Sequence, residues 1–205
     1  MPPFTPSPNP SPQAIWQGFH WSFFINVQGL IISLSRFEAH LALGDLPAAK
    51  TELATATDLM LASGASMELA GSFSHTQYEQ SVRPTMTPPQ VKSTNFSGLM
   101  SWEHAALMQI WKRLRPAFEH LPAELKPQHQ AFIQAYKSLA IAHRAVCERF
   151  GGAESGSIRF DQGYALDTLD KFSQSRLKLI DPSNRETESC PFQMNQRHGK
   201  HSINS

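Results

Sequence analysis

Apolar residues recur at spacings of three and four along most of the chain, which is the pattern of amphipathic helices. The clearest run extends from Trp16 to Leu41, and Gly44 is expected to end that helix. No segment alternates apolar and polar residues as a half-buried strand does. The sequence therefore predicts an all-α bundle of about five to six helices. The later helices are expected over residues 47–63, 65–82, 98–118, 126–150 and 161–180.

Two segments of different composition flank this helical pattern. Residues 1–12 contain six prolines, and proline lacks the backbone N–H that helices and central strands need. We therefore expect an extended, disordered arm there. Residues 181–205 are mostly polar and offer few side chains for burial, so they are expected to form a flexible tail. The folded domain is predicted over residues 13–180.

Charge and composition exclude several classes of protein. The chain has 18 Lys and Arg against 17 Asp and Glu, so it lacks the basic excess of an electrostatic nucleic-acid binder. Hydrophobic residues make up 40% of the sequence, which is enough for a packed core. No apolar run reaches the roughly 18 residues of a membrane span. The N-terminus shows no signal-peptide pattern, so we expect a cytoplasmic protein without nucleic-acid or membrane partners.

Scattered histidines on apolar helices allow two interpretations: a haem or metal pocket, or ordinary core histidines with satisfied hydrogen bonds. A di-iron bundle needs a Glu-x-x-His spacing, which neither Glu38 with His40 nor Glu103 with His104 provides. No signature of a serine or cysteine nucleophile is present. Most helical histidines are interpreted as background near helix ends or on polar faces: His40, His75, His104, His120 and His129.

The end of the predicted fifth helix and the residues that follow it carry the most informative spacing. The spacing of His143, Arg149, Gly152, Gly156 and Ser157 resembles the haem-ligand helix and the following glycine-rich loop of tryptophan 2,3-dioxygenases. This resemblance implies that His143 ligates the iron of haem b, with Gly152 and Gly156 in the loop beside the cofactor. Ser157 stands at the position of the family threonine whose hydroxyl contacts the substrate's amino-acid group.

The start of the predicted first helix resembles a second motif of the same family. His20, Phe23 and Gln28 are similar to the distal histidine and the residues that follow it, with Gln28 one position early. The resemblance implies that His20 lies over the haem and accepts the indole N–H of the substrate. Trp16 and Phe23 would then line an apolar substrate pocket, although core packing explains both residues equally well.

A third motif lies between the predicted third and fourth helices. Arg83, Met86 and Pro88 keep the family spacing, and residues 97–101 read Ser-Gly-Leu-Met-Ser, similar to its Ser-Gly-x-x-Ser. The resemblance implies that Arg83 binds the substrate carboxylate through two parallel hydrogen bonds, and that Ser97 lies in the distal pocket. The alternative for Arg83 is an ion pair with a surface acid.

Together the three motifs imply a haem-dependent oxygenase acting with O2 on the indole ring of tryptophan or a similar aromatic amino acid. Ring cleavage with two oxygen atoms and insertion of one oxygen atom both remain open. Ile158 and Arg159 replace two family glycines, so the loop is expected to close differently. The rival interpretation is a non-catalytic helical module that binds haem, another ligand or a partner. Either protein is expected to form a homo-oligomer, a dimer or a tetramer, through the apolar first helix and the two tails.

Overall fold

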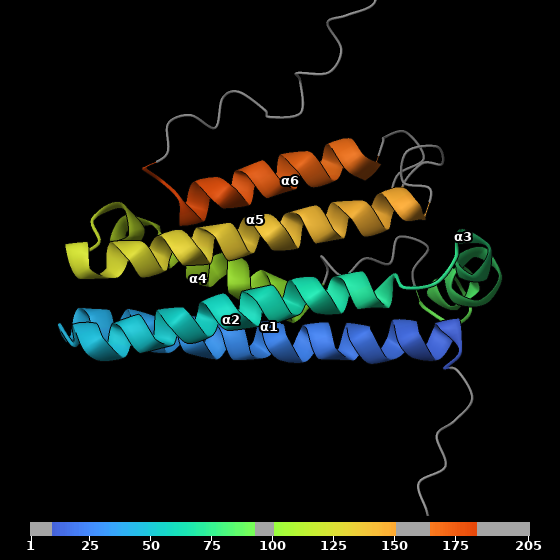
Figure 1. The fold of residues 1–205 in the computed structure, drawn as a ribbon, viewed down its shortest axis with the longest axis horizontal. Helices are drawn as coiled ribbons and strands as arrows, with labels where there is room; N and C mark the ends of the chain where they lie inside the picture. Colours follow the sequence, from blue (N-terminus) through green and yellow to red (C-terminus); the bar gives the residue numbers. More distant parts are fainter. Residues whose placement is uncertain (1–9, 93–100, 151–164, 184–205) are drawn as a thin grey trace, which may run out of the picture.

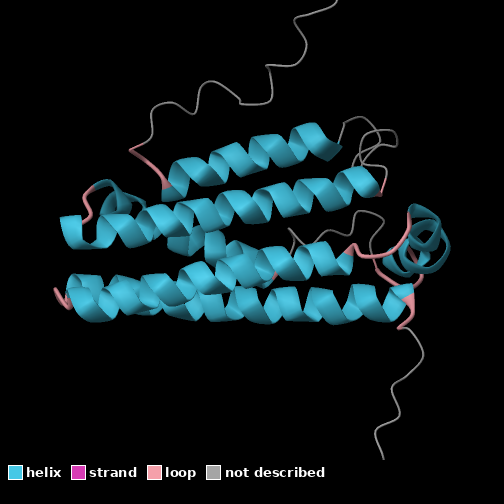
Figure 2. Cartoon of the chain, viewed as in Figure 1, coloured by secondary structure: helices cyan, strands magenta, loops and turns pink. Residues whose placement is uncertain are grey.

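The computed structural model describes residues 10–92, 101–150 and 165–183, and Figure 1 shows how their helices are arranged. Every regular element in these ranges is helical (Figure 2), so the predicted all-α bundle is confirmed. The long helices are α1 (Pro12–Ala42), α2 (Leu46–Ala70), α4 (Trp102–Glu119), α5 (Lys126–Arg149) and α6 (Ala165–Ile180). The short ones are α3 (His75–Gln77), the π-helix η1 (Tyr78–Val82) and the 3-10 helices η2 (Arg83–Met86) and η4 (Ala123–Leu125).

Helices α1 and α2 form an antiparallel hairpin that makes up one side of the bundle (Figure 1). Helix α5 packs along α2, α6 packs along α5, and α4 contacts both α1 and α6. The short helices α3, η1 and η2 cover the end of the bundle where α1 begins and α5 ends (Figure 1). Within the described ranges, no helix has both the length and the apolar character needed to cross a membrane.

The turn between α1 and α2 forms where the sequence predicts it. Gly44 has a φ of 74°, a conformation that glycine adopts without the steric penalty of a side chain. Asp45 then caps α2, because its carboxylate accepts a hydrogen bond from the Ala48 amide at 3.1 Å.

The predicted end of the second helix at residue 63 is wrong, because α2 continues to Ala70. Gly64 does not break this helix. A Cβ at position 64 would lie 3.5 Å from the Leu139 Cα, so the glycine sits where α2 and α5 approach closely. The chain leaves the helix at Gly71 instead, and Ser74 and Gln77 form a capping box that starts α3. The single helix expected over 65–82 is therefore replaced by the end of α2, a turn, α3 and η1.

The remaining boundaries agree with the prediction to within a few residues wherever the structure describes them. Helix α4 begins at Trp102 and not at 98, with the Ser101 hydroxyl accepting from the His104 amide at 3.2 Å. Helix α1 begins at Pro12, inside the expected arm. Residues 98–100, 161–164, and most of the predicted arm and tail lie outside the described ranges.

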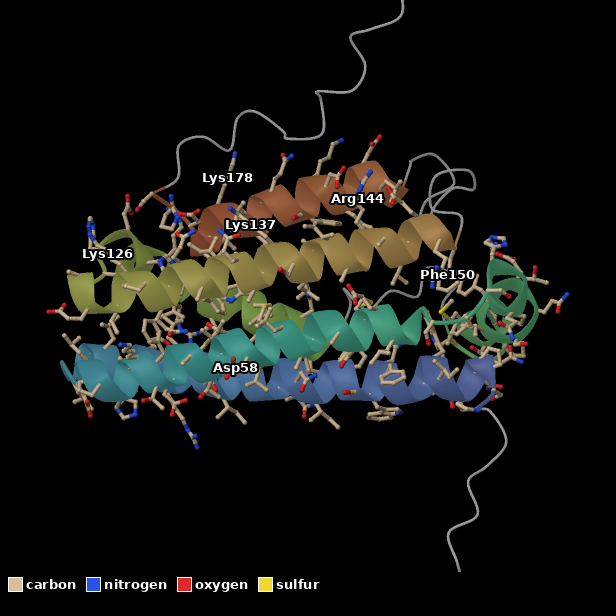
Figure 3. All side chains as sticks on the ribbon, viewed as in Figure 1. Asp58, Lys126, Lys137, Arg144, Phe150 and Lys178 are labelled. Carbon is tan, nitrogen blue, oxygen red and sulfur yellow. The ribbon has the colours of Figure 1, made fainter. Side chains whose placement is uncertain are left out.

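Two groups of buried side chains hold the helices together. The main core joins α1, α2, α4, α5 and α6, and burying each large apolar side chain contributes about 1.5–3 kcal/mol. Its largest fully buried members include Leu34, Phe37, Leu53, Met60, Trp111, Leu114, Phe132 and Ile180. A second group, here called the aromatic end cluster, consists of Trp16, Phe73, Tyr78 and Phe150. Figure 3 labels Phe150 at the end of α5, next to the short helices.

Candidate functional site

His143 is a partly buried residue of α5, one turn before Cys147. Burial, followed by the positive charge of Arg176 and by His20, lowers the pKa of His143 to about 4. The imidazole is therefore neutral near pH 7, and a neutral ring nitrogen is the form that binds a metal. The structure thus brings His143 of α5, His20 of α1 and Arg176 of α6 close together.

His20 is oriented by its own helix. Its Nδ1 lies 2.9 Å from the Trp16 carbonyl oxygen, and its ring lies against the Trp16 ring with centroids 4.1 Å apart. Burial lowers the pKa of His20, against the smaller opposing effect of this hydrogen bond. Because Nδ1–H donates to the carbonyl, Nε2 keeps its lone pair and can accept a hydrogen bond. Trp16 also packs on Tyr78 and Phe150, so it joins His20 to the aromatic end cluster.

His104 belongs to the same interior region, although the sequence interpretation treated it as background. Its Nε2 lies 3.0 Å from Nη2 of Arg176, which donates the hydrogen bond. Burial and the charge of Arg176 lower the pKa of His104 to about 4. A signal for this position was present in the sequence, because His104 shares a helix face with the buried Leu107 and Trp111. We call His20, His104 and His143 the histidine cluster.

Arg176 is the second interior residue that the sequence interpretation missed. Its guanidinium lies over the Phe172 ring at 5.3 Å from the ring centroid, and the Tyr136 hydroxyl lies nearby. Burial lowers the pKa of Arg176, while Tyr136 raises it. Its sequence signal was an arginine within the apolar stripe that Phe172 and Ile180 mark on α6.

Arg83 lies beside the aromatic end cluster and is already paired. Its Nη1 donates to both carboxylate oxygens of Glu79, at 2.8 and 3.1 Å. The Arg83 charge lowers the pKa of neighbouring Tyr78, but burial dominates and raises that pKa to about 12. The predicted binding of a substrate carboxylate by Arg83 stays a prediction, and it would have to compete with Glu79.

The other predicted site residues divide into two groups. Phe23 packs against the main core and contacts Phe24, with ring centroids 5.7 Å apart, so packing accounts for its position. The remaining predicted residues lie outside the described ranges: Ser97, Gly152, Gly156 and Ser157.

Cys147 is a partly buried thiol on the same helix as His143. Burial, together with the neighbouring Glu148, raises the pKa of Cys147 to about 11, so the thiol is protonated near pH 7. Among the described residues, no three His, Cys, Asp or Glu side chains form a group that could hold a metal ion. The donors that the interior does provide are single imidazoles from different helices.

Comparisons with known proteins agree on one family. The family model for SfmD 3-methyl-L-tyrosine peroxygenases matches residues 1–131. The 3-methyl-L-tyrosine peroxygenase of Streptomyces lavendulae is 30% identical over 168 residues, which cover 80% of this chain and 46% of that enzyme. The chain therefore spans about half the length of this curated relative. No solved structure gives a significant match. The more distant resemblance to tryptophan 2,3-dioxygenases stays a prediction. By both the family model and the relative, the chain belongs to the SfmD 3-methyl-L-tyrosine peroxygenase family.

Proposed function

We propose that this chain forms the haem-binding part of an enzyme that inserts oxygen into an aromatic amino acid. The observation that carries the proposal is His143, a partly buried imidazole of α5 that stays neutral near pH 7 because burial and the nearby Arg176 and His20 lower its pKa. Three helices contribute these groups, so the bundle holds them in a fixed arrangement. The related 3-methyl-L-tyrosine peroxygenase is an oxidising enzyme, which supports the proposal that this chain acts as an oxidoreductase.

The donor set fits haem b. A porphyrin supplies four nitrogen ligands to its iron and needs one or two axial ligands from the protein, for which histidine is common. Separate imidazoles such as His143 and His104 suit that need. Burial keeps both rings neutral, so no proton has to leave before a nitrogen donor binds. His143 would hold the iron, and Gly152 and Gly156 are predicted beside the cofactor.

When bound, haem would supply the oxygen chemistry, and the protein would supply orientation and electrostatics. His20 provides an acceptor at Nε2 next to the flat surface of Trp16. A phenol O–H and an indole N–H can both donate to such an acceptor, so His20 would orient either kind of ring. The surrounding aromatic end cluster would exclude water from that side.

The family relative favours a phenol over an indole. The name of that relative gives 3-methyl-L-tyrosine as its substrate and peroxygenation as its reaction. We therefore propose that this chain acts on a tyrosine-like amino acid as substrate, with a peroxide as oxidant. In that reaction a ring C–H becomes C–OH, the peroxide O–O bond breaks, and the second peroxide oxygen leaves as water. The initial expectation of tryptophan and O2 becomes the competing possibility that the assay has to test.

The experiment compares His143→Ala with His129→Ala in the full chain after reconstitution with haemin. His129 is a matched control, because it is another buried histidine of α5 and lies 14 positions away, about 21 Å along the helix. We expect a Soret band for wild type and for His129→Ala, and its loss in His143→Ala. A Soret band of equal intensity in His143→Ala would contradict the assignment of His143.

The substrate is tested on the loaded wild-type protein. L-tyrosine, 3-methyl-L-tyrosine and L-tryptophan are each titrated into the protein while the Soret band is followed. Each amino acid is then incubated with the protein and either H2O2 or O2 with a reductant, and the product mass is measured by mass spectrometry. We expect the tyrosines to shift the band and to gain 16 Da with H2O2. A haem spectrum that responds to none of these amino acids would favour the non-catalytic binding module instead.

A further inference from the structure

Arg176 is partly buried, and its partners among the residues that the structure describes are uncharged. The guanidinium contacts the imidazole of His104 at 3.0 Å, the face of Phe172 and the hydroxyl of Tyr136. Among the residues that the structure describes, no carboxylate lies within ion-pair distance of Arg176. A partly buried cation without an anion is costly, because burial removes its hydration without replacing it by an opposite charge.

Three other arginines of the bundle each form an ion pair with a carboxylate. Arg83 pairs with Glu79 at 2.8 Å, Arg113 pairs with Glu38 at 2.9 Å, and Arg144 pairs with Asp170 at 2.9 Å. Figure 3 shows Arg144 beside α6, the helix that also carries Arg176. Within the described ranges Arg176 thus differs from these three arginines, because no carboxylate neutralises it there.

A second donor without a partner lies in the same part of the bundle. Trp111 is only 2% exposed, and its Nε1 has no hydrogen-bond acceptor within the described ranges. Its ring meets the Tyr136 ring edge to face, with centroids 5.5 Å apart, and Tyr136 in turn contacts Arg176. Tyr136 uses its own hydrogen to donate to the Ser173 carbonyl at 3.2 Å. Among the described residues, this part of the bundle thus has donors, at Arg176 and Trp111, for which no acidic or carbonyl acceptor is present.

We infer that Arg176 is a binding residue for a carboxylate group of a bound ligand, next to the histidine cluster. A guanidinium carries five N–H donors, so the contacts to His104 and Tyr136 leave donors for two parallel hydrogen bonds to a carboxylate. The spare lone pairs of that carboxylate would suit the N–H of Trp111. The inference rests on the proposed function for the source of the carboxylate, which is either a haem propionate or the amino-acid substrate.

The first test needs no ligand and uses the thermal midpoint of the ligand-free full chain. Arg176→Gln removes a cation that has no carboxylate partner within the described ranges, so we expect a midpoint equal to or above that of wild type. Arg113→Gln, which removes an exposed ion pair, is the control and should lower the midpoint only slightly. If Arg176→Gln melts clearly below wild type while Arg176→Lys restores the midpoint, an acid of the chain itself already neutralises Arg176, and the inference is wrong.

The second test distinguishes the two carboxylate sources. Protoporphyrin IX is compared with its dimethyl ester by porphyrin fluorescence, and L-tyrosine is compared with tyramine by calorimetry. We expect wild type to prefer the free acid in one pair by about 10- to 100-fold, the value of a charge-assisted hydrogen bond. Arg176→Gln should abolish that preference and Arg113→Gln should keep it. A preference within the porphyrin pair identifies a haem propionate as the source of the carboxylate. A preference within the tyrosine pair identifies the amino-acid substrate.

Neither arm depends on iron. Metal-free porphyrin and tyrosine report on the carboxylate site even if haem iron is not ligated by His143, so failure of the proposed function stays distinguishable from failure of this inference. A wild-type protein with no preference for the acid in either pair would overturn the inference. A preference that Arg176→Gln leaves intact would overturn it as well.

Discussion

Gly64 lies where two helices of the bundle, α2 and α5, approach each other closely. It lies in the interior of α2, where glycine costs up to about 1 kcal/mol relative to alanine through backbone entropy. A Cβ at this position would meet the Leu139 backbone of α5 at 3.5 Å, an ordinary van der Waals distance. A methyl group is therefore accommodated, whereas the next carbons of a longer side chain would meet the α5 backbone.

We predict that Gly64→Ala raises the free energy of unfolding by roughly 0.5–1 kcal/mol, and that Gly64→Leu lowers it by about 1–3 kcal/mol. Urea denaturation followed by circular dichroism measures both. Gly18→Ala is the control for helix propensity alone, because no atom lies within 4 Å of a Cβ there. A loss of stability in Gly64→Ala would show that α2 and α5 pack more tightly than the structure indicates.

The individual site residues were predictable from the sequence to different degrees. His143 and His20 could be selected because fixed spacings to neighbouring residues mark them. His104 and Arg176 have no such motif: each carries only the weaker signal of a polar residue on an apolar helix face, and their contact forms only when α4 and α6 pack together. The Arg83 ion pair was foreseen as an alternative, but its strength depends on a π-helical turn that the sequence pattern does not indicate.

At the scale of elements, His129 connects α5 to the end of α6. Its Nε2–H donates to the Ile180 carbonyl at 2.7 Å, and its ring stacks on Phe118 at a centroid distance of 4.5 Å. Burial lowers the pKa of His129 below its ordinary value of 6.5, against smaller opposing effects of Ile180 and Asp181. Protonation therefore favours the unfolded chain, in which this imidazole is hydrated.

This shift predicts a pH dependence of stability. Above pH 6.5 the ring is neutral in both states and its contribution is fully present; as the pH falls below 6.5, the unfolded state binds the proton first and stability is lost. His129→Gln keeps a donor for Ile180 but does not titrate. We expect the fall in urea midpoint from pH 7.5 to pH 5 to be smaller in His129→Gln than in wild type. An equal fall in both proteins would contradict the lowered pKa.

Helix ends were predictable where a local signal coincides with the end of packing. Gly44 ends α1 because the chain has to adopt a positive φ there. Gly64 carries the same sequence signal but lies within a helix, because the contact with α5 outweighs its low helix propensity. Single-sequence patterns report local preferences, so they cannot show which glycine lies against another helix.

For the whole molecule, the structure separates stability from the candidate chemistry. The main core fills the centre of the bundle, and the aromatic end cluster closes one end. The histidine cluster connects the two regions, since His20 contacts Trp16 and His104 is linked through Arg176 to Tyr136 of the main core. Because the three histidines are not members of either buried group, we expect substitutions in the core to act mainly on stability and substitutions in the cluster to act mainly on the candidate site.

We predict that Leu34→Ala lowers the free energy of unfolding by about 2–5 kcal/mol, because Leu34 is fully buried in the main core. The haem that remains bound to the folded fraction should keep its wild-type spectrum. His20→Ala should show the opposite pattern, with little change in the urea midpoint and a weakened spectral response to tyrosine. If Leu34→Ala alters the haem spectrum of the folded fraction, core and site are not separable.

The most direct test of the central claim is chemical rescue of the iron ligand. The full-chain His143→Gly variant is incubated with haemin and titrated with imidazole while the Soret band is recorded, with wild type and His129→Gly as references. If His143 ligates the iron, the Soret band lost in His143→Gly should return on addition of imidazole at the wild-type position, and His129→Gly should need no rescue. A His143→Gly protein that has the wild-type spectrum without imidazole would contradict haem ligation by His143.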